Sequence, residues 1–117
     1  MKRAVVALAL AALAPAAFAH AFLEHAEPRV GSNVSRAPDQ VMLRFSEALE
    51  PAFSTVQVLD ASGKRVDRDD RKFDPRDAAV MRVSVPPLPP GKYRVKWRAL
   101  SADTHVTQGD FTFEVGR

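Results

Sequence analysis

The sequence predicts an all-β protein, built as an antiparallel β-sandwich of about seven strands. Short stretches in which apolar and polar residues alternate recur along the chain, and a period of two is typical of half-buried strands. Pro, Gly, Asp and Ser separate these stretches, as expected for turns. Beyond the first twenty residues, the one helix-like segment is 47–53, and Pro51 limits it to a single turn. Many short strands without helices favour two packed sheets.

The first nineteen residues have the three parts of a secretory signal peptide in the expected order. Lys2 and Arg3 are basic, residues 5–14 form an apolar run, and residues 17–19 read Ala-Phe-Ala, which suits a signal peptidase. A membrane anchor is one alternative, but this run is shorter than the roughly 20 residues that span a bilayer. A buried core helix is another, but the run is apolar on every face. We therefore expect cleavage after Ala19 and a single mature domain over residues 20–117.

The composition of the mature chain excludes several classes of protein. The signal segment holds two of the seventeen basic residues and none of the fourteen acidic residues, so the mature net charge is +1. No basic run with interleaved aromatic residues indicates nucleic-acid binding, and the mixed-charge stretch 67–72 is interpreted as a solvated loop. The chain has no cysteine, which excludes disulfides, thiolate ligands and cysteine enzymes. Export without cysteine indicates a bacterial periplasm or the cell exterior.

The alternating stretches can be placed along the mature chain. A first strand is expected before the turn at 26–32, and residues 62–64 suit a hairpin turn between Val58 and Val66. Four prolines within 86–92 prevent regular pairing there. We interpret Trp97 and the phenylalanines as packing between the sheets. The remaining predicted strands are centred on residues 41–45, 56–58, 81–85, 93–97 and 111–115.

Cleavage after Ala19 would give His20 unusual chemistry, because it would become the first residue. Its free amine and its imidazole Nδ1 could then close a chelate ring on one metal ion, which a mid-chain amide nitrogen cannot do. The unperturbed pKa of such an amine is about 7.7–8.0, so metal binding must displace a proton near neutral pH.

A second group of candidate ligands lies in the segment 101–109, which reads SADTHVTQG. Asp103 and His105 are two residues apart, and in an extended segment such positions point to the same side. Gly109 is expected to let the chain turn before the last strand. The alternative is that Asp103 caps a turn and His105 is a surface histidine. An amine, two imidazoles and a carboxylate together suit a tetragonal Cu(II) site, with Zn(II) as a weaker alternative.

The mature sequence resembles the CopC-type periplasmic copper-binding proteins of bacterial copper resistance. The resemblance is carried by HAFLEHAEPRVGS at 20–32, LRFSEAL at 43–49, GKYRVKWRALSADTHVTQG at 91–109 and FTFEV at 111–115. It implies an immunoglobulin-like sandwich with Greek key connections that binds one Cu(II) ion through His20, Asp103 and His105. In some members the glutamate that corresponds to Glu47 lies at or beside the metal, so the resemblance also makes Glu47 a candidate ligand. The other interpretation of Glu47 is a strand-end carboxylate that bonds the N-terminus or faces water.

Two departures from the family pattern bear on the site. Members with a second, Cu(I) site carry a methionine-rich loop, whereas residues 61–80 contain no methionine, so the resemblance is to the Cu(II)-only members. Thr104 stands where the family often has glycine. His25, on the expected first strand, is interpreted as a strand histidine rather than a ligand, and the alternative is a base beside the ligands or a weak external ligand.

The sequence thus predicts a monomeric periplasmic Cu(II) protein that buffers or delivers copper and catalyses no reaction. By analogy with the family, a CopD-type inner-membrane protein is its expected partner. A copper monooxygenase of the histidine-brace type is one alternative, although such enzymes need an open coordination position for oxygen. A metal-free exported interaction module is another.

Overall fold

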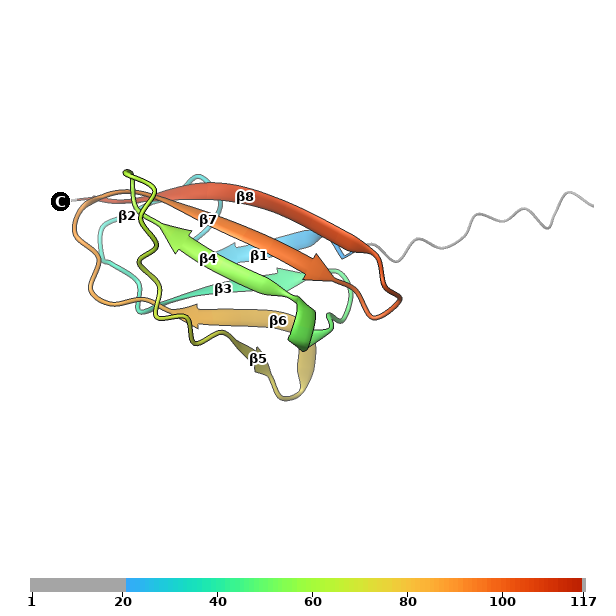
Figure 1. The fold of residues 1–117 in the computed structure, drawn as a ribbon. Coiled ribbons are helices and arrows are strands. Elements are labelled where there is room, and N and C mark those ends of the chain that lie inside the picture. The colour runs from blue at the N-terminus through green and yellow to red at the C-terminus, as the bar shows by residue number, and fades with distance from the viewer. Residues whose placement is uncertain (1–20, 117) are drawn as a thin grey trace, which may run out of the picture.

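The computed structural model describes residues 21–116 and shows two four-stranded sheets packed face to face (Figure 1). The first sheet has the strand order β1-β3-β6-β5 and the second has the order β2-β8-β7-β4. This arrangement confirms the predicted all-β sandwich. The strands are β1 Leu23–Glu27, β2 Asn33–Val34, β3 Gln40–Phe45, β4 Thr55–Leu59, β5 Lys72–Asp74, β6 Asp77–Ser84, β7 Gly91–Leu100 and β8 Val106–Val115.

Residues 21–116 contain eight strands, and two of them were not predicted. β2 has only two residues and β5 only three, which is too short for a periodic pattern to show in the sequence. β2 also pairs in parallel with β8, so the sandwich is not antiparallel throughout. The other strand pairs are antiparallel, and the longest ladder joins all ten residues of β7 to all ten of β8.

The inward-facing positions of the strands form one core. Leu43, Met81 and Phe113 are almost completely buried, and burial of a side chain of this size contributes about 1.5–3 kcal/mol to stability. Trp97 is half-buried and meets the ring of Phe45 edge-on, with 5.1 Å between ring centroids. Its packing role was predicted correctly.

Gly109 has a different role from the predicted one. It lies inside β8, opposite Trp97, rather than at a turn before the last strand. A Cβ atom at this position would come within 2.8 Å of the Trp97 indole. Glycine is therefore needed because the indole packs directly against the backbone of β8.

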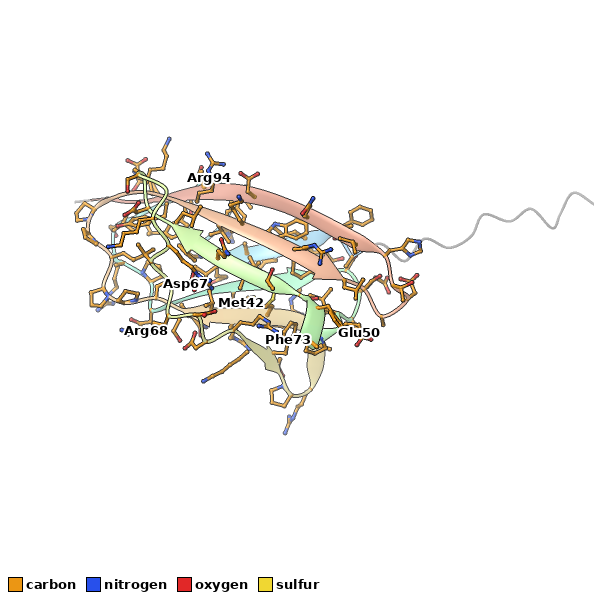
Figure 2. The ribbon with its side chains drawn as sticks, in the orientation of Figure 1. Met42, Glu50, Asp67, Arg68, Phe73 and Arg94 are labelled. Carbon is orange, nitrogen blue, oxygen red and sulfur yellow. The ribbon has the colours of Figure 1, made fainter. Side chains whose placement is uncertain are left out.

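Residues 67–72 are only in part the solvated loop that the sequence indicated, because some of their side chains are exposed and others are buried. The side chain of Asp67 is fully buried and accepts hydrogen bonds from the backbone N–H of Val58 at 2.7 Å and from the Arg65 guanidinium. Asp70 accepts a bond from the backbone N–H of Ser84 at 2.8 Å. Because Val58 is in β4 and Ser84 in β6, this segment joins the edge strand of one sheet to a strand of the other sheet. Figure 2 labels Asp67 and Arg68 along it.

The connections behave largely as expected. Residues 47–53 form only a three-residue 3₁₀ turn, Pro51–Phe53, and none of the helical segments in 21–116 is long and apolar enough to cross a bilayer. The turn at 62–64 is closed by a bond from the N–H of Val66 to the carbonyl of Val58 at 2.8 Å. Residues 85–89 pair with no strand of either sheet.

Candidate metal centre

Three segments that are distant in sequence meet at one end of the sandwich. The hydroxyl of Thr107 donates to the carbonyl of Ala21 at 2.7 Å, which ties the first described residue to β8. Phe22 exchanges two bonds with Ser46, one through the serine hydroxyl and one through its backbone N–H, each of 2.8 Å. In Figure 1 the end of β7 and the start of β8 lie at this same end. We call it the metal end, because it carries the predicted ligands Asp103 and His105.

A buried serine organises the turn that holds these two residues. Ser101 is only 1% exposed, and its backbone N–H donates to the carbonyl of His105 at 2.9 Å. Its hydroxyl donates to Oδ1 of Asp103 and accepts the backbone N–H of His105 at 3.2 Å. One side chain thus restrains both candidate ligands. The sequence analysis did not single out Ser101, although a serine two residues before an aspartate is a common turn pattern.

Asp103 and His105 are brought together as predicted, but by a different backbone conformation. Oδ2 of Asp103 lies 3.2 Å from Nδ1 of His105, and the two side chains are 42% and 53% exposed. The segment is a turn rather than an extended strand, because Thr104 between them has a φ of +75°. Two donor atoms bound to one metal ion at right angles lie roughly 2.8 Å apart. The observed spacing is therefore close to that of two ligands of one ion.

The charge state of Asp103 also suits a ligand. The hydrogen bond from Ser101 lowers the pKa of the Asp103 carboxyl below its usual value, against an increase from partial desolvation. The neighbouring His105 lowers this pKa further. Asp103 is consequently a carboxylate at neutral pH, with Oδ1 held by the serine and Oδ2 beside His105.

Thr104 occupies a conformation that a β-branched residue rarely adopts. Its φ of +75° lies in the left-handed region, which glycine enters without steric cost. This geometry explains why glycine suits the position, and it shows that threonine strains the turn rather than simply stiffening it.

Glu47, another ligand predicted from the sequence, is placed differently. Glu47 is exposed in the bend directly after β3, and the carbonyl of the next residue, Ala48, accepts the N–H of Ala102 at 3.1 Å. Glu47 therefore lies beside the turn without joining it. Within residues 21–116, no three His, Cys, Asp or Glu side chains gather closely enough to hold a metal ion. His20 lies outside the described residues.

His25 lies on β1 opposite Arg44 of β3. Its Nε2 atom is 2.9 Å from Oε2 of Glu27, so a local carboxylate already contacts this ring. This pairing agrees with the interpretation of His25 as a strand histidine.

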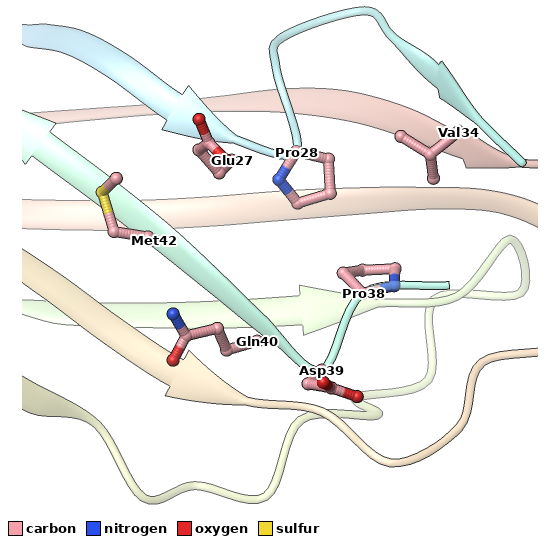
Figure 3. A pocket seen from close by; sticks show the side chains of 7 residues that line it. All are labelled: Glu27, Pro28, Val34, Pro38, Asp39, Gln40 and Met42. Carbon is pink, nitrogen blue, oxygen red and sulfur yellow. The ribbon is translucent and has the colours of Figure 1, made fainter. Parts of the chain in front are cut away.

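A surface pocket of about 490 Å³ lies at the end of β3 that is opposite the metal end (Figure 3). It begins beside Gln40, the first residue of β3, whereas Ser46 and Glu47 follow the last one. It is therefore separate from the candidate metal centre. The residues that line it are Glu27, Pro28, Val34, Pro38, Asp39, Gln40 and Met42.

The comparisons with known proteins identify the family. The protein-family model for the CopC domain matches residues 23–116, which are almost all of the described residues. The chain belongs to the CopC family. This assignment agrees with the resemblance seen in the sequence.

The matches to individual relatives cover most of this chain but different shares of the relatives themselves. Copper resistance protein C from Escherichia coli is 37% identical over 106 residues, which are 85% of this chain and 83% of that protein. The crystal structure of CopC from Methylosinus trichosporium OB3b, at 36% identity, superposes with a TM-score of 0.78 over 83% of this chain and 94% of that chain. The copper transport protein CutJ from Bacillus subtilis (strain 168) is 33% identical over 114 residues. That match takes in 97% of this chain but only 21% of CutJ.

Proposed function

We propose that this CopC-family protein binds one Cu(II) ion in the periplasm and buffers or delivers it. The observation that supports the proposal most directly is the 3.2 Å spacing of Asp103 Oδ2 and His105 Nδ1 at the metal end. The names of its relatives, copper resistance protein C and copper transport protein CutJ, point to the same cargo.

In this proposal the ion lies between Asp103 and His105, and His20 completes its coordination. His20 directly precedes Ala21 in the chain, and the Ala21 carbonyl is bonded to Thr107, two residues after His105. The amine and the Nδ1 atom of the mature His20 would add two nitrogens to the nitrogen of His105 and the oxygen of Asp103. Such a set of nitrogen and oxygen donors selects Cu(II) by geometry and by the order of metal affinities.

Glu47 would act at the edge of this site. Its position one residue before Ala48, whose carbonyl bonds to the Asp103 turn, allows a carboxylate to approach the ion or the amine of His20. A direct ligand and a hydrogen-bonding neighbour are both consistent with this placement.

The proposed cellular setting is the periplasm, and it is supported by the predicted signal peptide and by the family. Cleavage after Ala19 would release the protein into the periplasm and create the amine on which the site depends. The chain itself carries no catalytic step, in keeping with a copper-binding family. A CopD-type inner-membrane protein would be its partner in moving copper, and the protein would work as a monomer.

Mass spectrometry of the exported protein, followed by Cu(II) titration of that form, tests the proposal. We expect a chain that starts at His20 and binds one equivalent of Cu(II), with an electron paramagnetic resonance (EPR) spectrum of nitrogen and oxygen ligands. A chain that starts elsewhere but binds as tightly would contradict the ligand set. Absence of a bound-copper signal would favour a metal-free module, and sustained oxygen turnover with a reductant would favour a monooxygenase.

A further inference from the structure

Four basic side chains lie in a row on the outer face of the second sheet. Lys92, Arg94, Lys96 and Arg98 occupy alternate positions of β7, and all four are exposed. The residues that alternate with them face the core, where Val95 is fully buried. Successive side chains of a strand point to opposite faces and rise by about 3.4 Å per residue, so the row is about 20 Å long. We call these four residues the basic row.

Most of the basic row has no acidic partner within residues 21–116. Arg94 forms an ion pair with Asp110 of β8, and the other three cations form none with a described residue. Opposite the row, β8 carries only two carboxylates, those of Asp110 and Glu114, and the facing residues of β4 are uncharged. Four cations and two carboxylates leave this face with an excess of positive charge.

The outer face of the first sheet is organised differently, because its charges are matched across strands. Arg44 of β3 pairs with Asp77 at 3.2 Å, and Arg82 of β6 pairs with Asp74 at 3.5 Å. Mixed charges of this kind are sufficient to keep a protein soluble. The unmatched cations are therefore concentrated on one side of the sandwich, and such a field attracts an anionic partner to that side.

The surroundings of the basic row indicate which anionic partner fits. Single-stranded nucleic acid stacks its bases on aromatic side chains, but Tyr93 and Trp97 of β7 pack inward against Phe113 and Phe45. Protein interfaces are centred on apolar and aromatic residues and are depleted of charge there, whereas this row is charged along its whole length. A surface of lipid phosphates requires neither feature, because it attracts basic side chains through their summed charge.

We infer that the basic row docks the protein onto the anionic phospholipid surface of a membrane. The outer face of β7 lies against the headgroups, and the export predicted from the signal peptide brings the chain to such a surface. Each Lys or Arg near an anionic membrane increases affinity about fivefold, so the attachment is weak and reversible. The inference goes beyond the proposed function and does not require copper, because Asp103 and His105 are not part of the row.

Co-sedimentation of the exported protein with lipid vesicles tests the inference. Vesicles with equal amounts of phosphatidylglycerol and phosphatidylcholine supply the anionic surface, and vesicles of phosphatidylcholine alone are the control. We expect binding only to the anionic vesicles, and its loss near molar salt, where the screening length is about 3 Å. No binding to the anionic vesicles, or equal binding to both kinds, would overturn the inference.

A competition experiment distinguishes a lipid surface from free phosphate as the source of the anion. Inorganic phosphate should release the protein from the anionic vesicles no better than sodium chloride of the same ionic strength, because both act only by screening. Release by phosphate at an ionic strength at which chloride has no effect would show a site for the free ion and contradict docking on lipid.

Paired charge variants separate the basic row from the net charge of the protein. Lys96→Gln combined with Arg98→Gln should weaken binding to the anionic vesicles by about 30-fold. Lys72→Gln combined with Arg76→Gln is the matched control, because it removes one Lys and one Arg from exposed positions on and just after β5. The control should bind nearly as well as the wild type, with an unchanged Tm in both variants. Equal losses of binding would show that net charge, and not this face, is responsible.

A gain of binding is expected when the acidic partner within the face is removed. Asp110→Asn leaves Arg94 without its ion pair and removes one carboxylate, so affinity for the anionic vesicles should rise about fivefold. Unchanged or weaker binding would contradict the assignment of this face. Cu(II) titration of the same variants should give the wild-type affinity, and failure of the wild-type chain to bind Cu(II) would remove the proposed function without affecting the vesicle result.

Discussion

Two turns of this protein use an aspartate in opposite ways. In the 64–70 segment, the side chain of Asp67 is fully buried. Its oxygens accept hydrogen bonds from the backbone N–H groups of Val58 and Asp69 and from the Arg65 guanidinium. In the turn at the metal end, Asp103 has one oxygen held by Ser101 and leaves the other beside His105, 42% exposed. Both carboxyl groups have a lowered pKa, but only Asp103 can offer an oxygen to an ion. Burial and saturated hydrogen bonding make a structural carboxylate, and partial satisfaction makes a candidate ligand.

Removal of the buried carboxylate should cause the largest change in this comparison. Asp67→Ala leaves the N–H of Val58 and the Arg65 guanidinium without their acceptor, so we expect a loss of about 3 kcal/mol in the free energy of unfolding. Urea denaturation measures this loss. Cu(II) affinity of the folded variant should not change, and a parallel loss of affinity would show that the two turns are coupled.

The same carboxylate predicts how stability depends on pH. Burial raises the pKa of Asp67, but the hydrogen bonds from Arg65 and the backbone outweigh this effect and lower it overall. A lowered pKa contributes stability above the unfolded value of about 3.9, and this contribution is lost as the pH falls through the folded pKa. Asp67→Asn should therefore lose less stability on acidification below about pH 4. If both proteins lost the same stability below about pH 4, protonation of Asp67 would not be the cause of the acid destabilisation.

His105→Ala should have the next largest effect, on affinity rather than stability. If Nδ1 is a ligand, we expect Cu(II) affinity to fall by at least about 100-fold, or about 2.8 kcal/mol. A competition titration against a chelator of known affinity measures this change. His25→Ala is the control, because its ring contacts Glu27 on β1 and should leave affinity unchanged. Full affinity in His105→Ala would remove this residue from the site.

Ser101→Ala sharpens the comparison, because it frees Asp103 without removing a ligand. We expect Cu(II) affinity to fall by about tenfold, with altered EPR parameters, because the orientations of both Asp103 and His105 are relaxed. Ser54→Ala is the matched control. Ser54 is equally buried, but its hydroxyl bonds only to the backbone of Glu50 and Leu100. If both variants lost stability alike and neither changed the EPR spectrum, Ser101 would be merely structural.

Thr104→Gly should have the smallest effect and should be stabilising. Glycine relieves the strain of a φ of +75°, so we expect a gain of about 0.5–1 kcal/mol and an increase of a few degrees in Tm. Differential scanning calorimetry of the metal-free protein measures it. A lower Tm would mean that the threonine hydroxyl, which donates to the carbonyl of Asp103, contributes more than the strain costs.

Local patterns in the chain were sufficient for much of the fold and for the choice of candidate ligands. Alternation at 41–45, 93–97 and 111–115 predicted β3, β7 and β8, because a strand with one buried face records that face in every second residue. The SADTH segment and the candidate His20 were likewise visible, since ligand chemistry depends on residue type. The prolines within 86–92 predicted an interruption between strands, because proline has no backbone N–H to donate to a neighbouring strand.

Tertiary structure alone decided the features that depend on distant neighbours. Gly109 is required by the indole of Trp97 on another strand, and Asp67 is buried because β4 supplies a donor nine residues earlier in the chain. The metal end exists because hydrogen bonds join residues 21 and 22 to Thr107 and Ser46, which are distant in the chain. A sequence specifies each side chain and its local periodicity, but burial and juxtaposition arise only when non-local contacts form.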